Sequence, residues 1–383
     1  MKIGILTHAL TGNYGGILQN FAMQTVLREL GHTPITIDYT KPLPLAIKLL
    51  SMCKRCAMQL IGRSSLPTRG WMTDAESRKV YANTRAFVNK YIATTQPVNI
   101  DEVGTFDGDF EALLVGSDQV WRYKYLGNEI GHFFGVSMPK TPIKVAYAAS
   151  FGTDKWEMPE SLTAICKQNI HTFNAVSVRE DSGVKLCRNY LDIPACLVLD
   201  PTMLVAKGVY EDVLRRNENK SEQTGMLATY VLDATTEKQE IVKLVASHLG
   251  CDVMPLAVTA TFDKVGRANI ESCVVPPVEE WLSGISESAF VITDSFHGTA
   301  FSIIFNKPFL TVGNKSRGLS RMTSLLNMFG LEARLVQEFD EHSILEKVNN
   351  AIDWASVNEI LETKRAASLE FLRRGLNDPK GEI

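Results

Sequence analysis

The sequence has 383 residues, of which 45% are hydrophobic and 22% are charged, as in ordinary globular proteins of about two domains. Its 40 basic and 43 acidic residues leave a net charge of −3, which provides no electrostatic footprint for nucleic acid. Seven scattered cysteines, no signal-peptide pattern and no apolar run of about 18 residues predict a cytoplasmic protein with reduced thiols.

The chain opens with a strand–helix–strand pattern. Residues 2–8 are typical of a buried strand, 16–30 of an amphipathic helix that stops at Gly31, and 33–39 of a second strand. Such a βαβ unit implies parallel strands with a right-handed crossover. Residues 44–92 have a largely helical pattern.

Two series of alternating strands and helices follow. In the first, strands are expected at 111–118, 143–152 and 175–182, a helix from about Pro159, and 197–204 closes the series. In the second, strands are expected at 226–233, 251–258, 289–295 and 307–313, and helices at 235–250, 276–288 and 297–306. Helical segments finish the chain, the last from about Ser356 to Leu376.

This alternation predicts an α/β protein in which two Rossmann-like, doubly wound parallel sheets face a cleft. We expect an N-terminal domain over 1–200, a C-terminal domain over 201–355 and a terminal helix over 356–383. The charged, turn-rich segment 207–225 is typical of a domain boundary.

Polar or ionisable residues follow six of the predicted strands. In open parallel sheets, ligands bind beyond the carboxyl ends of the strands, so these segments indicate a lined cleft. They are 7–16, 116–119, 150–152, 179–182, 200–201 and 294–299.

The loop after the first strand does not match a nucleotide-binding motif. The dinucleotide fingerprint needs G-x-G-x-x-G, but the glycines here are Gly12, Gly15 and Gly16, and no G-K-[ST] follows for a P-loop. The free amides at the start of the next helix could still bind an anion. The alternative is a tight turn in which Asn13 caps the helix, and both can hold together.

The segment TDSFHGTA is the most concentrated signal. Asp294 and Ser295 end a predicted strand, and His297 lies on the turn into the next helix, where Gly298 permits close approach and Thr299 can cap. A histidine there can be cationic or act as a general acid near neutral pH. Alternatively, its hydrogen bonds fix the loop.

Cationic side chains indicate an anionic ligand. Arg179 follows a strand, where its guanidinium suits a carboxylate or phosphate, and Lys315 and Arg317 could add positive charge. The alternative for Arg179 is an ion pair with Glu180, Asp181 or Asp200.

Two features of the segment 43–63 have simpler interpretations. Cys53 and Cys56 form a C-x-x-C without a second pair of ligands, so we expect no metal site. The segment is both apolar and basic, which would allow peripheral contact with a membrane or packing as a domain helix.

Five ordered motifs together resemble the polysaccharide pyruvyl transferase family. They are N-Y-G-x-x-L-Q (13–19), V-G-S-D-Q-V-W (115–121), S-V-R-E (177–180), D-P-T (200–202) and T-D-S-F-H-G-T (293–299). The resemblance implies a fold similar to GT-B glycosyltransferases. It also implies transfer of the pyruvyl unit of phosphoenolpyruvate to two hydroxyls of a cell-surface glycan or its lipid-linked precursor, forming a ketal.

The resemblance also implies roles for individual residues. The N-terminal domain would hold the acceptor and the C-terminal domain the donor, with phosphoenolpyruvate as substrate and no other cofactor or metal. Arg179 would bind the donor's anionic groups, and His297 would bind phosphate or act as acid. Asp118 is the leading candidate for the base or hydroxyl-binding residue, and Asp294 is the second candidate. Further contacts are expected from Asn13, Tyr14, Gly15, Gly16, Gln19, Ser117, Gln119, Trp121, Ser150, Ser295, Phe296, Gly298, Thr299, Lys315 and Arg317.

One departure keeps alternatives open. Several family members have R-L-H-G where this chain has Ser295 to Gly298, so an arginine expected on the donor is missing, and Lys315 or Arg317 could replace it. A glycosyltransferase that uses a nucleotide sugar and a non-catalytic glycan- or anion-binding protein therefore remain as alternatives.

Overall fold

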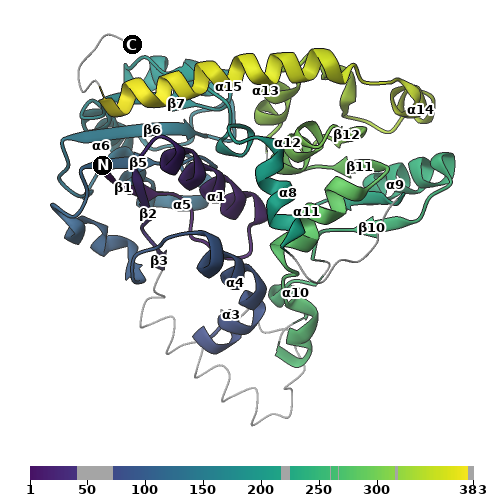
Figure 1. The fold of residues 1–383 in the computed structure, drawn as a ribbon, viewed down its shortest axis with the longest axis horizontal. Helices are drawn as coiled ribbons and strands as arrows, with labels where there is room; N and C mark the ends of the chain where they lie inside the picture. The colour runs from purple at the N-terminus through teal and green to yellow at the C-terminus, as the bar shows by residue number, and fades with distance from the viewer. Residues whose placement is uncertain (41–71, 217–224, 259, 266, 315–317, 378–383) are drawn as a thin grey trace.

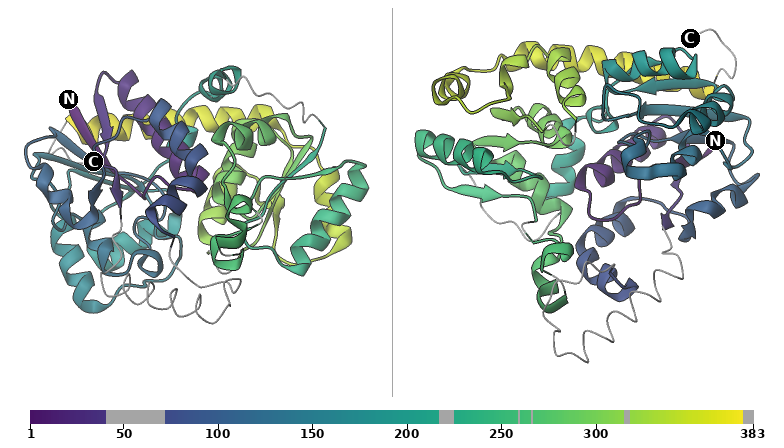
Figure 2. Two further views of the ribbon diagram at one scale, coloured as in Figure 1. Left: turned by 90° about the horizontal axis from the view of Figure 1, so that it is seen from below. Right: turned by 180° about the vertical axis from the view of Figure 1, so that it is seen from behind.

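The computed structural model describes residues 1–40, 72–216, 225–258, 260–265, 267–314 and 318–377 (Figure 1). Two parallel sheets dominate it, each flanked by helices (Figure 2). The first has the order β2 (Thr33–Thr36), β1 (Lys2–Leu6), β5 (Ala112–Val115), β6 (Ile143–Ala149), β7 (Ala175–Val178), β8 (Cys196–Leu197). The second has the order β10 (Val253–Pro255), β9 (Leu227–Tyr230), β11 (Phe290–Thr293), β12 (Phe309–Val312), β13 (Leu335–Val336). These sheets confirm the prediction of an α/β protein with two Rossmann-like units.

Helices alternate with the strands as the sequence predicts. In the first half they are α1 (Tyr14–Glu29), α3 (Asp74–Val80), α4 (Ala82–Tyr91), η1 (Ile100–Phe106), α5 (Tyr123–Leu126), η2 (Gly127–Phe134), α6 (Glu160–Ile170), α7 (Asp181–Leu186) and η3 (Cys187–Leu191). From there on they are η4 (Pro201–Met203), α8 (Lys207–Arg215), α9 (Thr236–Leu249), α10 (Phe262–Val265), η5 (Arg267–Cys273), α11 (Val278–Glu287), α12 (Phe296–Ile304), α13 (Ser320–Met328), η6 (Glu332–Arg334), α14 (Glu341–Asn349) and α15 (Trp354–Asn377). None of the helices in the described ranges has the length and apolar character needed to span a membrane.

The structure differs locally from the sequence expectations in three places. The predicted strand 33–39 ends at Thr36, and the chain then forms β3 (Tyr39–Thr40), which pairs with β4 (Val98–Asn99). The chain leaves the sheet around Asp38, whose buried carboxylate pairs with Arg85.

The second difference is α1, which begins at Tyr14, two residues earlier than expected. The third is the expected boundary segment 207–225, most of whose described part lies in α8, because Tyr210 and Val213 are buried on one face of that helix. The segment 43–63, with its cysteine pair and its amphipathic pattern, lies outside the described residues.

The first half of the chain contains the first sheet and the second half contains the second sheet, and one apolar core extends across both halves. The ring of Tyr210, on α8, lies 4.9 Å from that of Phe301 and 6.2 Å from that of Phe21, so side chains of α1, α8 and α12 pack together. The long helix α15 (yellow) extends from the second half back across the first (Figures 1 and 2). There its Ser368 hydroxyl accepts a hydrogen bond from the Leu199 amide at 3.0 Å. This shared core positions the carboxyl ends of the two sheets relative to each other.

Candidate active site

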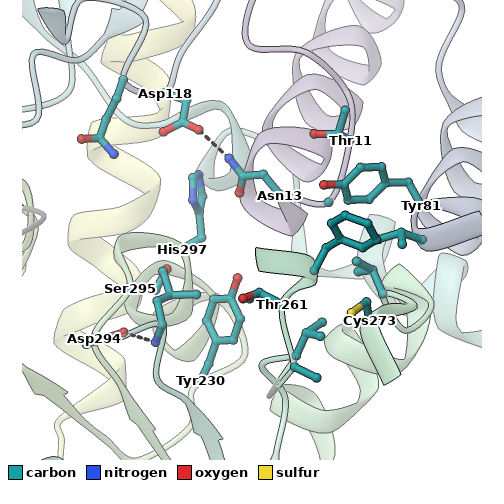
Figure 3. Close-up of a pocket in the computed structure, with 18 of the residues that line it drawn as sticks. Thr11, Asn13, Tyr81, Asp118, Tyr230, Thr261, Cys273, Asp294, Ser295 and His297 are labelled. Atoms are coloured by element: carbon teal, nitrogen blue, oxygen red, sulfur yellow. Dashed lines mark hydrogen bonds between the residues drawn. The ribbon is translucent and has the colours of Figure 1, made fainter. Parts of the chain in front are cut away.

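The strand order reverses once in each sheet, and such switch points leave a crevice beyond the strand ends. In the first sheet the reversal lies between β1 and β5, and in the second between β9 and β11. A pocket of about 450 Å³ lies between the two halves and is lined by residues that follow all four strands (Figure 3). Asn13 and Asp118 come from the first half, and Ser295 and His297 from the second.

His297 lies in the first turn of α12 and is 5% exposed. Its Nε2 has no hydrogen-bond partner among the described residues and lies 3.8 Å from Oδ2 of Asp200, too far for a hydrogen bond. On its other side the ring lies against α1, because a Cβ built at Gly15 would be 1.9 Å from Nδ1 of His297. Gly15 therefore provides space for the imidazole.

The turn that carries His297 depends on a second glycine. A Cβ built at Gly298 would lie 2.1 Å from Oγ1 of Thr293, which accepts a hydrogen bond from the Ser295 amide at 3.1 Å. Thr299 closes the turn through its hydroxyl, which donates to the Ser295 carbonyl at 3.1 Å. Strand β11 and helix α12 therefore hold His297 rigidly at the pocket wall.

Beside the imidazole, one arginine joins two buried carboxylates. Arg179 donates to Oδ1 of Asp118 at 2.9 Å and to Oδ2 of Asp200 at 2.7 Å, and its side chain is fully buried. The ring of Phe296 lies 4.3 Å from its Cζ, a cation–π contact across the two halves. Ser117 donates to Oδ2 of Asp200 at 2.8 Å. The ion pair foreseen as the alternative for Arg179 is thus present.

Both carboxylates remain ionised to unusually low pH. Burial alone would raise the pKa of Asp118, but the guanidinium of Arg179 outweighs it and holds this pKa well below its usual range. Burial would also raise the pKa of Asp200, and neighbouring His297 and Arg179 hold it well below its usual range. Asp118 has a backbone φ of 76°, which directs its carboxylate toward Asn13, whose Nδ2 donates to it at 2.9 Å.

Arg321, on α13, is a lining residue that the sequence analysis missed. It is 6% exposed, and burial followed by the charge of Arg179 lowers its pKa to about 10. It lies within an apolar helical pattern beside Met322 and Leu325, which are buried. The sequence signal that could have identified Arg321 is an arginine placed on the apolar face of a predicted helix.

Asp294 is saturated by local donors. Its oxygens accept hydrogen bonds from the Leu232 amide at 2.6 Å, the Asp233 amide at 3.1 Å, Lys238 Nζ at 2.6 Å and Asn314 Nδ2 at 3.0 Å. The carboxylate therefore fixes the loop after β9.

The structure divides the predicted site residues into two groups. Those that line the pocket are Asn13, Asp118, Gln119, Asp294, Ser295, Phe296 and His297. Those buried behind it are Tyr14, Gly15, Gly16, Gln19, Ser117, Trp121, Ser150, Arg179, Gly298 and Thr299. Lys315 and Arg317 lie outside the described residues.

The buried group has structural partners. The Trp121 indole donates to the Phe133 carbonyl at 2.9 Å, and Ser150 Oγ donates to Glu180 at 2.9 Å. Gln19 donates to the Gly16 carbonyl at 3.0 Å.

Tyr14 bridges the two halves. Its hydroxyl donates to the Pro276 carbonyl at 3.0 Å, and its ring stacks on Trp281 with 5.6 Å between centroids. Both partners belong to the second half of the chain. Within the described ranges, no three His, Cys, Asp or Glu side chains group as a metal ion would require.

Comparison with solved structures identifies the fold. The structure is similar to a putative UDP-N-acetylglucosamine 2-epimerase from Listeria monocytogenes, with a TM-score of 0.51, 10% identity and coverage of 100% of this chain and 99% of that one. It is also similar to Arabidopsis thaliana UGT89C1 complexed with UDP, with a TM-score of 0.50, 8% identity and coverage of 98% and 100%. At these identities the likeness shows the fold alone, which is that of GT-B enzymes.

Comparison with curated protein sequences returns no match. The family model for polysaccharide pyruvyl transferases matches residues 13–316, which include the loop at Asn13, the carboxylates and His297. The chain therefore belongs to the polysaccharide pyruvyl transferase family and is a transferase.

Proposed function

We propose that the protein transfers the pyruvyl unit of phosphoenolpyruvate to two sugar hydroxyls of a cell-surface glycan or its lipid-linked precursor, forming a pyruvate ketal and releasing phosphate. The observation that carries the proposal is the imidazole of His297, which lines the pocket and whose buried Nε2 has no hydrogen-bond partner among the described residues. A proton carrier held in this way suits a reaction that begins by protonating carbon. No resident cofactor is needed.

The donor carries a carboxylate and a phosphate, so its site needs cations or N–H donors. Arg321 contributes a guanidinium to the pocket, and the N-terminus of α12 contributes a positive dipole and unpaired amides. The terminal nitrogens of Arg179 already bind Asp118 and Asp200. Because Arg321 and the start of α12 line the pocket, we assign the donor's anionic groups to them, and the orientation of the carboxylates to Arg179.

The reaction can be written with these residues. His297, as imidazolium, gives its proton to the methylene carbon of phosphoenolpyruvate, and the π electrons form that C–H bond, leaving an oxocarbenium-like C2. Asp118, which stays ionised, accepts a hydrogen bond from the first hydroxyl and orients it for attack on C2. Neutral His297 then takes that hydroxyl's proton. The second hydroxyl forms the other C–O bond as the C2–phosphate bond breaks, and its proton leaves with the phosphate.

The test is phosphate release from phosphoenolpyruvate by purified protein with candidate glycan acceptors. We expect release that depends on acceptor and is lost in His297→Ala, with wild-type release in His342→Ala, an exposed histidine on α14 outside the pocket. Release that His297→Ala leaves unchanged would refute the assignment of the proton carrier.

A thermal-shift series separates the alternatives. Stabilisation by phosphoenolpyruvate, and not by UDP- or GDP-sugars, is expected. Stabilisation by a nucleotide sugar alone would contradict pyruvyl transfer and favour glycosyl transfer. Binding of phosphoenolpyruvate without phosphate release from any acceptor would favour a non-catalytic binding protein.

A further inference from the structure

The pocket itself has a polar half and an apolar half, which are not the same as the two halves of the chain. Four ionisable side chains that line it, Asp118, Asp294, His297 and Arg321, belong to one half. The other, which we call the apolar half, is lined by Val80, Tyr81, Tyr230, Phe262, Cys273 and Val275 among the described residues. Figure 3 shows Tyr81 and Cys273 on the side away from Asp118 and His297. No charged side chain among the described residues lines the apolar half, so this half suits an uncharged ligand better than the donor's anionic groups.

Hydrogen bonds between the N-terminal and the C-terminal half of the chain form one wall of the apolar half of the pocket. The Val275 amide donates to the Val80 carbonyl at 2.9 Å, and Asn83 Nδ2 donates to the Val275 carbonyl at 2.9 Å. Because Val80 and Val275 both line the pocket, this seam is part of its wall.

Two ion pairs extend the seam between α3 and η5. Arg267 pairs with Glu76, and Lys79 pairs with Glu271. These pairs are at least partly exposed and contribute little by themselves, but they add to the backbone hydrogen bond at the same junction. The wall of the pocket is therefore continuous between Val80 and Val275.

The floor of the apolar half is aromatic and continuous with the polar half. A Cβ built at Gly12 would lie 2.7 Å from Cε1 of Tyr81, so the Tyr81 ring lies against the loop that leads to Asn13. A ligand that reaches Asp118 along this loop therefore passes the Tyr81 ring. Sugars offer an apolar C–H face to such rings and hydroxyls at their rim.

Building on the proposed function, we propose that the apolar half binds a single chain-terminal neutral sugar of the acceptor, with its C–H face on Tyr81. An internal sugar would need chain on both sides of it, and the seam at Val80 and Val275 closes one of those sides. A uronic acid carboxylate would lose its hydration without meeting a cation among the described residues of this half. The volume of about 450 Å³ accommodates small ligands of this kind.

The first experiment compares acceptors in the phosphate-release assay. Methyl glycosides of neutral hexoses and N-acetylhexosamines are tested against methyl uronides, and against trisaccharides whose only free hydroxyl pair is on the middle sugar. We expect neutral terminal sugars to be preferred by at least about tenfold in kcat/KM, roughly 1.4 kcal/mol. Equal or better use of uronides or middle sugars would overturn this inference and leave pyruvyl transfer intact. If none of the acceptors supported phosphate release, the proposed function would be refuted as well.

The second experiment locates the subsite. Tyr81→Ala should raise the acceptor KM about tenfold and leave the KM of phosphoenolpyruvate unchanged, whereas Tyr125→Ala, at a tyrosine 41% exposed and outside the pocket, should change neither. Val275→Ala should also raise the acceptor KM, by a smaller factor. If Tyr81→Ala does not fold, the acceptor KM of Val275→Ala tests the inference in its place. An acceptor KM that neither folded variant alters would overturn the inference.

Discussion

The substitution Gly15→Ala tests whether α1 positions the imidazole of His297. The added Cβ would lie 1.9 Å from Nδ1, whereas real Cβ contacts do not fall below 3.0 Å, so the ring must move by about 1 Å or more. A displacement of this size at a reacting group costs about 10²-fold in rate, or roughly 2.7 kcal/mol in activation free energy. Alanine is up to about 1 kcal/mol better than glycine inside a helix, so α1 should still form.

The assay is phosphate release from phosphoenolpyruvate, with thermal unfolding measured in parallel. We expect kcat to fall about 10²-fold and the melting temperature to fall as well, because displacing the buried ring costs about 1–3 kcal/mol. Gly208→Ala on α8 is the matched control, because nothing lies within 4 Å of its built Cβ, and it should leave kcat unchanged. Near wild-type kcat in folded Gly15→Ala would refute the claim that His297 works where the structure places it.

Three further substitutions or conditions test the network behind the pocket. Arg179→Met removes the cation that is hydrogen-bonded to both buried carboxylates, Asp118 and Asp200, so the free energy of unfolding measured in urea should fall by about 3–5 kcal/mol, and no loss would contradict the ion-pair assignment. Because the folded-state pKa values of Asp118 and Asp200 are depressed, their stabilisation is complete above the unfolded value of about 4 and is lost as pH falls. The urea midpoint should therefore drop between pH 5 and pH 3, less steeply in Asp200→Asn, and equal slopes in the two proteins would refute this. Tyr14→Phe removes the hydrogen bond to Pro276 and should lower the free energy of unfolding by about 1 kcal/mol in the same urea experiment, and an unchanged value would show that this bond does not hold the halves together.

Apolar runs and their spacing were sufficient to predict the two parallel sheets. Strands β1 and β11 are short apolar stretches bounded by polar residues, and α9 ends at Gly250, whose φ of 64° is the expected left-handed cap. The rule that ligands bind beyond strand ends singled out Asp118 and His297, and both line the pocket.

Side-chain direction at these strand ends could not be predicted. Trp121 follows the same strand as Asp118, yet its indole packs on Phe134 at 4.6 Å in the core. Arg179 also ends a strand but is engaged by two carboxylates whose proximity depends on the tertiary fold. Arg321 comes from a helix face, and periodicity cannot say which face borders a pocket. The contact between Arg179 and Asp118 joins residues 61 positions apart, and the contact between Arg179 and Phe296 joins the two halves, so no local pattern encodes them.

Structural analysis of the reaction product tests the central claim most directly. The protein is incubated with phosphoenolpyruvate and a neutral terminal sugar acceptor, and the product is examined by mass spectrometry and NMR, with His297→Ala in parallel. We predict a pyruvate ketal bridging two hydroxyls of the terminal sugar, formed in equal amount with phosphate and absent in His297→Ala. An unmodified acceptor, or a sugar transferred from a nucleotide donor in its place, would contradict the account.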